Sequence, residues 1–153
     1  MLMTLLVVVI SSALFVYWFR FTVILILRTR PAVNYAPQVA AANRLSFVEI
    51  RHKLHASTDA ENLGGFCKAL QQDYRKLKYL LGHAATGQAG RYTAEQRLLM
   101  ANFRVMALCC PAALRFRPNA AKLALLEMSN ILEYFANVMG RRIASPAGEA
   151  ARA

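Results

Sequence analysis

The first 27 residues place the strongest constraint on what this chain can fold into. Residues 1–19 carry no charged side chain, and after Arg20 a second apolar run continues to Leu27. As an α-helix this segment would be about 40 Å long, whereas the hydrocarbon core of a bilayer is about 30 Å thick. The segment is therefore predicted to be a transmembrane helix.

A cleaved signal peptide is the alternative interpretation of this segment. Such a peptide has basic residues before an apolar stretch of about 7–15 residues, and a small-residue cleavage site after it. Here no Lys or Arg precedes the apolar run, the run is longer, and no convincing cleavage site follows. We therefore expect an anchor that is not removed.

Arg20 allows two registers for the span. If residues 1–19 cross the membrane, Arg20 lies at the interface with Tyr17 and Trp18. If residues 5–27 cross it, Arg20 is inside the membrane and needs a partner there. Insertion is favourable in both cases, because a central Arg costs about 3 kcal/mol while each of many Leu, Ile, Val and Phe residues contributes about −0.3 to −0.6 kcal/mol. The anchor is a tether in the first register and a binding element in the second.

Basic residues follow the anchor rather than precede it. Arg28 and Arg30 come directly after it, and Arg44, Arg51 and Lys53 come next. The positive-inside rule then places the N-terminus outside and the rest of the chain in the cytoplasm. The expected location is a bacterial inner (plasma) membrane, with a single pass.

The remaining residues predict helices, because β-branched and aromatic residues are sparse after residue 30. The fold class expected is all-α, with one N-terminal transmembrane helix followed by a cytoplasmic antiparallel bundle of about four helices. The expected divisions are an anchor (1–27), a juxtamembrane linker (28–38), the cytoplasmic helical bundle (39–143) and a disordered tail (144–153).

Apolar spacing and terminal signals set the expected helix bounds. Helices are predicted over 39–56, from Thr58 to about Gly82, over 94–110 and from Pro118 to about Met139. Capping boxes at Thr58–Glu61 and Thr93–Gln96 begin the second and third helices. Pro31 and Pro37 disfavour helix in the linker, Pro111 should kink or end the third helix, and Gly140 should cap the last. A second membrane insertion over 98–114 is the alternative for the apolar third helix.

The second predicted helix has the most regular apolar pattern. Its apolar positions alternate spacings of four and three, which is typical of a bundle or coiled-coil interface. We call these six residues the seam: Leu63, Cys67, Leu70, Tyr74, Leu77 and Leu81. Gly64 and Gly65 near its start are expected to permit close approach of a neighbouring helix.

The net charge of +11 points to an acidic partner surface. Anionic lipid headgroups, nucleic acid and acidic proteins all meet that description, and lipid is favoured because an anchor is adjacent. Nucleic acid is disfavoured, since only one compact basic cluster occurs. The candidate partner or lipid contacts are Arg20, Arg28, Arg30, Arg44, Arg51, Lys53, Arg75, Lys76 and Lys78.

The chain offers little for metal or catalytic chemistry. His52 and His55 are three residues apart on a predicted helix, and Glu49 completes an E-x-x-H step, but a di-iron bundle needs a second such step. These three are weak metal candidates only. Cys67, Cys109 and Cys110 are expected to be reduced thiols, and no nucleophile lies in a recognisable signature. We expect no cofactor and no enzymatic activity.

These observations favour a non-enzymatic accessory, scaffold or assembly subunit of a larger membrane complex. Its partners would be other membrane or membrane-associated subunits. One alternative is a self-associating membrane-surface module, in which the seam pairs between copies and the basic face binds anionic lipid. Another is a metal-binding or catalytic helical bundle.

Overall fold

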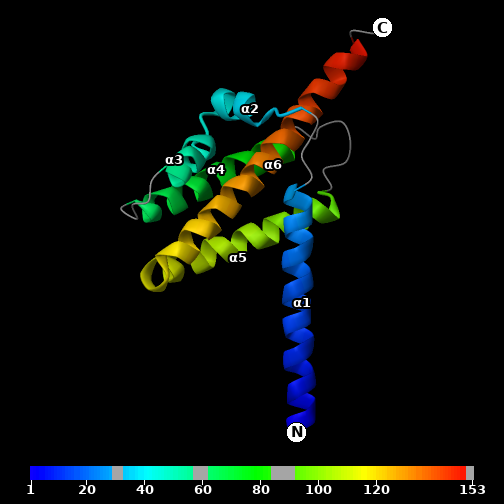
Figure 1. The fold of residues 1–153 in the computed structure, drawn as a ribbon. Coiled ribbons are helices and arrows are strands. Elements are labelled where there is room, and N and C mark those ends of the chain that lie inside the picture. Colours follow the sequence, from blue (N-terminus) through cyan, green and yellow to red (C-terminus); the bar gives the residue numbers. More distant parts are fainter. Residues whose placement is uncertain (29–32, 57–61, 84–91, 151–153) are drawn as a thin grey trace. The chain divides into compact units, whose positions relative to one another are not determined.

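The computed structural model describes residues 1–28, 33–56, 62–83 and 92–150, and all regular structure in them is helical. The expectation of an all-α chain is confirmed. The chain divides into two compact units, Met1–Arg30 and Pro31–Ala153, which we call the anchor unit and the helical unit. Figure 1 shows the helices of both units.

The anchor unit consists of one helix, α1 (Leu2–Arg28). It is long and apolar enough to cross a membrane, as the sequence predicts. Most of its side chains are exposed around the whole helix, so it has no polar face of the kind that a surface helix shows. Thr22 Oγ1 donates a hydrogen bond to the Trp18 carbonyl at 2.8 Å, which satisfies this hydroxyl inside the helix.

The prediction of one helix over 39–56 is wrong, because the chain forms two: α2 (Ala36–Asn43) and α3 (Phe47–Ala56). Between them, Arg44 is left-handed, with φ 50° and ψ 53°. The Arg44 N–H donates to the Ala41 carbonyl at 3.4 Å, and the Leu45 N–H donates to the Ala40 carbonyl at 2.9 Å. This is the Schellman arrangement that ends helices, here with Arg where Gly is usual.

The start of α2 also corrects the predicted linker over 28–38. Pro37 lies in the first turn of the helix, where its missing N–H costs no hydrogen bond and its fixed φ suits the helix. Asn137 Oδ1, from a distant helix, accepts the backbone N–H groups of Tyr35 and Ala36 at 2.7 and 3.0 Å. The tertiary fold therefore supplies the N-terminal cap of α2.

The next helix is α4 (Leu63–His83), and all six seam residues are buried in it. Gly64 does not face a neighbouring helix, since a Cβ there would meet nothing within 4 Å. A Cβ on Gly65 would meet only the side chain of Asn62. The expectation of a close helix approach at these glycines is wrong. The capping box predicted at Thr58–Glu61 lies outside the described residues.

The capping box at the start of α5 (Ala94–Phe116) is confirmed. Thr93 Oγ1 accepts the Gln96 N–H at 3.3 Å, and Gln96 Oε1 accepts the Thr93 N–H at 3.1 Å. The helix continues past Pro111, where an end or kink is predicted. Cys110 beside it is buried in the core, so packing holds the helix in place despite the lost backbone hydrogen bond.

The last helix, α6 (Pro118–Ala150), is longer than predicted and includes most of the expected disordered tail over 144–153. Gly140 does not cap it. A Cβ at Gly140 would lie 2.2 Å from Tyr35 Cβ, so the glycine instead lets the chain before α2 pack against α6.

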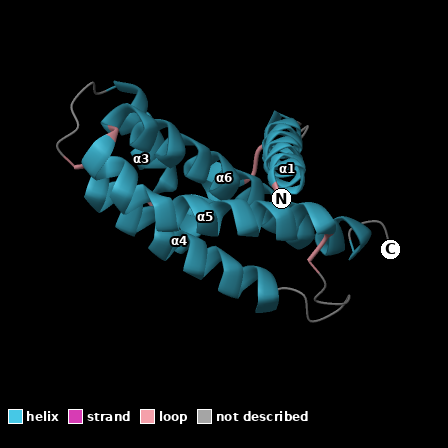
Figure 2. Cartoon of the chain, turned by 90° about the horizontal axis from the view of Figure 1, so that it is seen from below, coloured by secondary structure: helices cyan, strands magenta, loops and turns pink. Residues whose placement is uncertain are grey.

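Helix α6 is the central element of the helical unit, since it packs against α2, α3, α4 and α5. Helices α4, α5 and α6 also contact one another and lie side by side in Figure 2. Their shared core contains an aromatic cluster. The rings of Tyr74 and Phe103 stack with centroids 4.2 Å apart, and Phe135 lies 6.5 Å from Tyr74. The core therefore joins one aromatic residue from each of the three helices.

Candidate interaction surfaces

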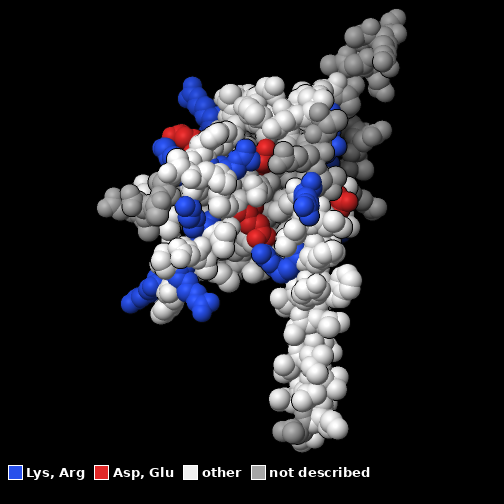
Figure 3. All heavy atoms as spheres, viewed as in Figure 1, with Lys and Arg blue, Asp and Glu red and all other residues white. Residues whose placement is uncertain are grey.

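The basic residues predicted as contacts belong to both units, and those of the helical unit lie on several helices. Arg20 and Arg28 are exposed on α1, and Arg30 lies outside the described residues. Arg75 and Lys76 are exposed on α4, and Lys78 is half-buried there. The predicted set is thus distributed over both units. Figure 3 shows the basic side chains of the helical unit spread over the visible face.

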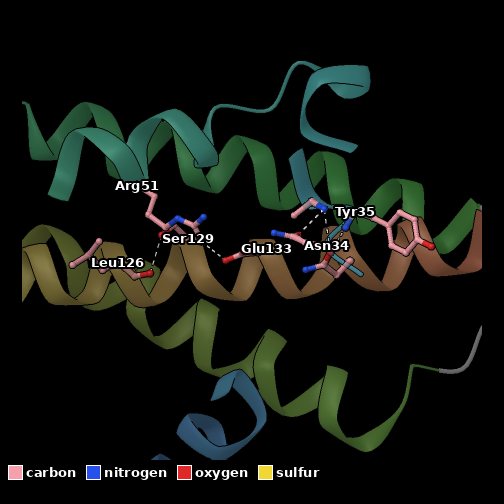
Figure 4. A network of polar contacts seen from close by, with 8 residues as sticks. Asn34, Tyr35, Arg51, Leu126, Ser129 and Glu133 are labelled. Atoms are coloured by element: carbon pink, nitrogen blue, oxygen red, sulfur yellow. Dashed lines mark hydrogen bonds and ion pairs between the residues drawn. The ribbon is translucent and has the colours of Figure 1, made fainter. Parts of the chain in front are cut away.

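Arg51 is a structural residue. It forms an ion pair with Glu133 of α6, and the side chains of both are only 27% and 24% exposed. Figure 4 shows this contact between α3 and α6, beside the hydrogen bond from Ser129 to the Leu126 carbonyl. Because the Arg51 guanidinium is engaged inside the unit, its charge is largely offset before any partner arrives.

Arg44 and Lys53 are also occupied by local structure. Arg44 ends α2 in a left-handed conformation, with its side chain exposed. Lys53 pairs with Glu49 one turn earlier on α3, with Nζ 2.6 Å from Oε1. Lys53 lowers the pKa of Glu49 through this hydrogen bond and its charge. The exposed pair contributes little to stability, because water screens it.

The described acidic side chains form contacts within the helical unit. Asp73 Oδ2 accepts the backbone N–H groups of Ser46 and Phe47 at 2.7 and 2.8 Å. The remaining contacts are Glu49 with Lys53, Glu95 with Tyr134, Glu127 with Asn102, and Glu133 with Arg51. Each acid whose side chain is described thus has a partner in its own unit. The net charge of +11 shows that basic side chains still outnumber the acidic ones.

Asp73 and Asn137 are two polar residues with structural roles that the sequence did not predict. Both are buried, and each caps the N-terminus of a helix far away in the sequence. Burial raises the pKa of Asp73, while the two backbone N–H groups and Lys76 oppose that shift. The only sequence signal is that Asp73 is adjacent to Tyr74 of the apolar seam, where a charged residue is out of place unless it is bonded.

The weak metal candidates do not assemble into a site. His52 and His55 are both exposed on α3, and the Glu49 carboxylate beside them is engaged by Lys53. Among the described residues, no group of three His, Cys, Asp or Glu side chains is placed to hold a metal ion. Structural zinc sites need four ligands and catalytic ones three.

The three cysteines are all unpaired in environments that differ. Cys67 and Cys110 are buried and belong to facing helices, whereas Cys109 is exposed. Burial, together with the neighbouring Cys67, raises the pKa of the Cys110 thiol to about 12. Cys110 is therefore a neutral thiol at physiological pH and behaves as a small apolar core residue.

The seam does not provide a surface for a second copy. Its six side chains are buried by packing of α4 against α3, α5 and α6 in the same chain. Pairing through the seam between copies would require this core to open.

An exposed apolar surface lies instead on α5. We call it the outer patch; its members are Val105, Leu108, Cys109, Ala112 and Phe116. Spacings of three, four, seven and eleven residues place these side chains on one side of a helix. The opposite side contains the buried residues Met106 and Cys110. The sequence predicts an apolar helix here, with membrane insertion over 98–114 as its alternative, and does not indicate which side of the helix is exposed.

Comparison with known proteins gives no relative. No protein-family model matches the chain, and no curated protein and no solved structure is significantly similar to it.

Proposed function

We propose that this chain is a non-enzymatic, single-pass membrane protein that serves as an accessory, scaffold or assembly subunit of a larger membrane complex. In this proposal α1 crosses a bacterial inner membrane with its N-terminal end outside. The helical unit is a cytoplasmic antiparallel bundle that contacts other subunits.

The observation that carries the proposal is the contrast between the two units. Helix α1 presents apolar side chains all around, as a lipid-embedded helix does. The helical unit uses four of its five described acidic side chains, together with Asn137, to join its own helices. Acids and bases that hold helices together in this way are not available to act on a substrate. A binding role is the function that such a unit supports best.

The test is purification of the full chain from native membranes in mild detergent, through a tag on the helical unit. We expect one or more stoichiometric partners. A control variant has α1 replaced by an unrelated membrane helix of the same length. Loss of the partner in that variant locates binding in α1, and its retention locates binding in the helical unit. A monomer without any stoichiometric partner would contradict the proposal.

The orientation has its own test in a Cys109→Ser background. Thr4→Cys at one end of α1 should react with a membrane-impermeant maleimide in intact cells. Lys68→Cys, an exposed position on α4, should react only after the membrane is permeabilised. The reverse pattern would overturn the proposed topology.

The alternative is a self-associating membrane-surface module. The outer patch and the net positive charge favour contact with a membrane surface. The seam no longer supports self-association, because its six side chains are buried within one chain. The oligomeric state in detergent separates the two, since a stable homodimer without other partners would favour the alternative.

A further inference from the structure

The outer patch on α5 exposes large apolar side chains, and no described element of the helical unit covers them. Leu108 is 80% exposed and Phe116 is 79% exposed. Leu123, early in α6, is a further large apolar side chain at 68% exposure. Single exposed apolar residues are ordinary in proteins, but a row of them along one helix face marks an interaction surface.

Basic side chains border this patch along one edge. Arg97, Arg104 and Arg115 are separated by seven and eleven residues, which are two and three helical turns, so they share one flank of α5. All three are exposed, and so is Arg117 just after the helix. From Gln96 to Leu126 the chain has no acidic residue. All charged side chains in this stretch are therefore basic.

We propose that the outer patch lies on the anionic surface of the membrane that α1 crosses. Leu108, Cys109 and Phe116 would enter the boundary between headgroups and acyl chains. The arginines would contact lipid phosphates at the flank. A helix with an apolar face and a basic edge is the kind that lies in the plane of the interface. Each basic side chain near an anionic leaflet strengthens such an association about fivefold.

A short covalent connection keeps the start of α2 within reach of the membrane that α1 is proposed to cross. Only seven residues separate Arg28, at the end of α1, from Ala36, at the start of α2. Even a fully extended connection of that length spans less than about 30 Å. The inference rests on the proposed insertion of α1, but it does not depend on a protein partner.

Other occupants fit the patch less well. Two copies facing each other through this surface would bring their arginine flanks together, with no acid between Gln96 and Leu126 to offset them. Nucleic acid would meet the arginines but would leave Leu108 and Val105 in contact with phosphate and water. An anionic bilayer satisfies both the apolar row and its basic edge.

Cys109 reports directly on the proposed contact, because it lies in the patch while Cys67 and Cys110 are buried. The full chain is reconstituted at one copy per lipid nanodisc, which leaves both faces of the bilayer accessible. One set of discs holds phosphatidylcholine alone, and the other holds phosphatidylcholine with one third phosphatidylglycerol. The rate of Cys109 alkylation by a water-soluble maleimide is followed by mass spectrometry.

We expect alkylation of Cys109 to be about tenfold slower in the anionic discs, and the difference to shrink at high salt. Leu108→Glu should make alkylation of Cys109 as fast in the anionic discs as in the phosphatidylcholine discs. The substitution should leave the fold intact, because the Leu108 side chain is exposed and does not support the core. Tyr79→Glu, a matched change at an exposed position of α4, should leave the protection unchanged. Arg115→Gln should weaken the protection without affecting the fold.

Four outcomes would overturn the inference while leaving the insertion of α1 intact. They are equal rates in the two lipids with the protein retained in the discs, protection that requires two copies per disc, protection that requires added RNA, and unchanged protection in Leu108→Glu. Protein that elutes apart from the discs would overturn both the inference and the insertion of α1. Retention with equal rates would overturn the inference alone.

Discussion

The Asp73 carboxylate on α4 lies 2.8 Å from the backbone nitrogen of Phe47 and accepts the N–H group at which α3 begins. A helix start normally takes its cap from a residue immediately before it. Here the capping residue is 26 positions away in the sequence. The first turn of α3 is therefore capped only when α4 packs beside it. The same contact fixes the break between α2 and α3.

Asp73→Ala is expected to lower the free energy of unfolding by about 2 kcal/mol, because it leaves the buried Phe47 N–H and the half-buried Ser46 N–H without an acceptor. Asp73→Asn should lose less, since its amide oxygen remains an acceptor. Urea denaturation of the full chain in mild detergent, followed by circular dichroism, measures both. A stability for Asp73→Ala equal to that of the original chain would show that the cap is not energetically important.

The dependence of stability on pH should also trace to Asp73. Its pKa in the folded protein is raised above the ordinary value of 3.8 by burial. The folded state therefore holds this proton more tightly than the unfolded state does. The associated stability is present below pH about 4 and is lost as the pH rises through the folded-state pKa. Asp73→Asn should flatten this part of the stability profile, and a profile with the same slope in both proteins would contradict the assignment.

Gly140→Ala should destabilise the protein, although alanine is the better helix former. Its Cβ would lie 2.2 Å from Tyr35 Cβ, and neither backbone can move without separating α2 from α6. A loss of about 2 kcal/mol is expected, as for other overpacking substitutions. Gly64→Ala is the matched control, because nothing lies within 4 Å of its added Cβ. It should gain up to about 1 kcal/mol. Equal effects of the two changes in thermal unfolding would refute the close contact.

The ion pair between Arg51 and Glu133 should show measurable coupling. A double-mutant cycle with alanine at both positions is expected to give about 1 kcal/mol, because both side chains are mostly buried. The Glu49–Lys53 pair on the same helix is the control, and because both side chains are exposed we expect its coupling to be smaller. Coupling that is no larger for Arg51–Glu133 than for the control would show that α3 is not held to α6 through this pair.

The buried thiols should resist alkylation in the folded chain. Since the pKa of Cys110 is raised to about 12, almost none of it is thiolate at neutral pH, and burial also blocks access. We expect Cys110 and Cys67 to react with a maleimide at least about a hundredfold more slowly than they do after denaturation. Peptide mass spectrometry distinguishes Cys110 from Cys109. Rapid modification of Cys110 in the folded protein would show that the α4–α5 contact opens readily.

Local sequence signals predicted the helices well where a signal acts within one or two turns. The capping box at Thr93 is one case, since its hydroxyl and the Gln96 side chain bond neighbouring backbone groups whatever surrounds them. The regular spacing of the seam is another, because one helix face must be buried if the rest is polar. The outer patch shows the limit of this reasoning. Val105, Leu108 and Phe116 are residue types that are common in protein cores. Only the packing of α5 against its neighbours shows that this side of the helix is exposed.

The sequence by itself determined that the chain is helical and that its first helix is long and apolar enough to cross a membrane, because both follow from composition and periodicity. Only the tertiary structure decided where α2 and α3 divide, why Gly140 lies within a helix, and which acids are already engaged. Asp73, Asn137 and Glu133 act on residues 26 to 102 positions away. Contacts over such separations depend on how the helices pack, and packing is not encoded in any local pattern.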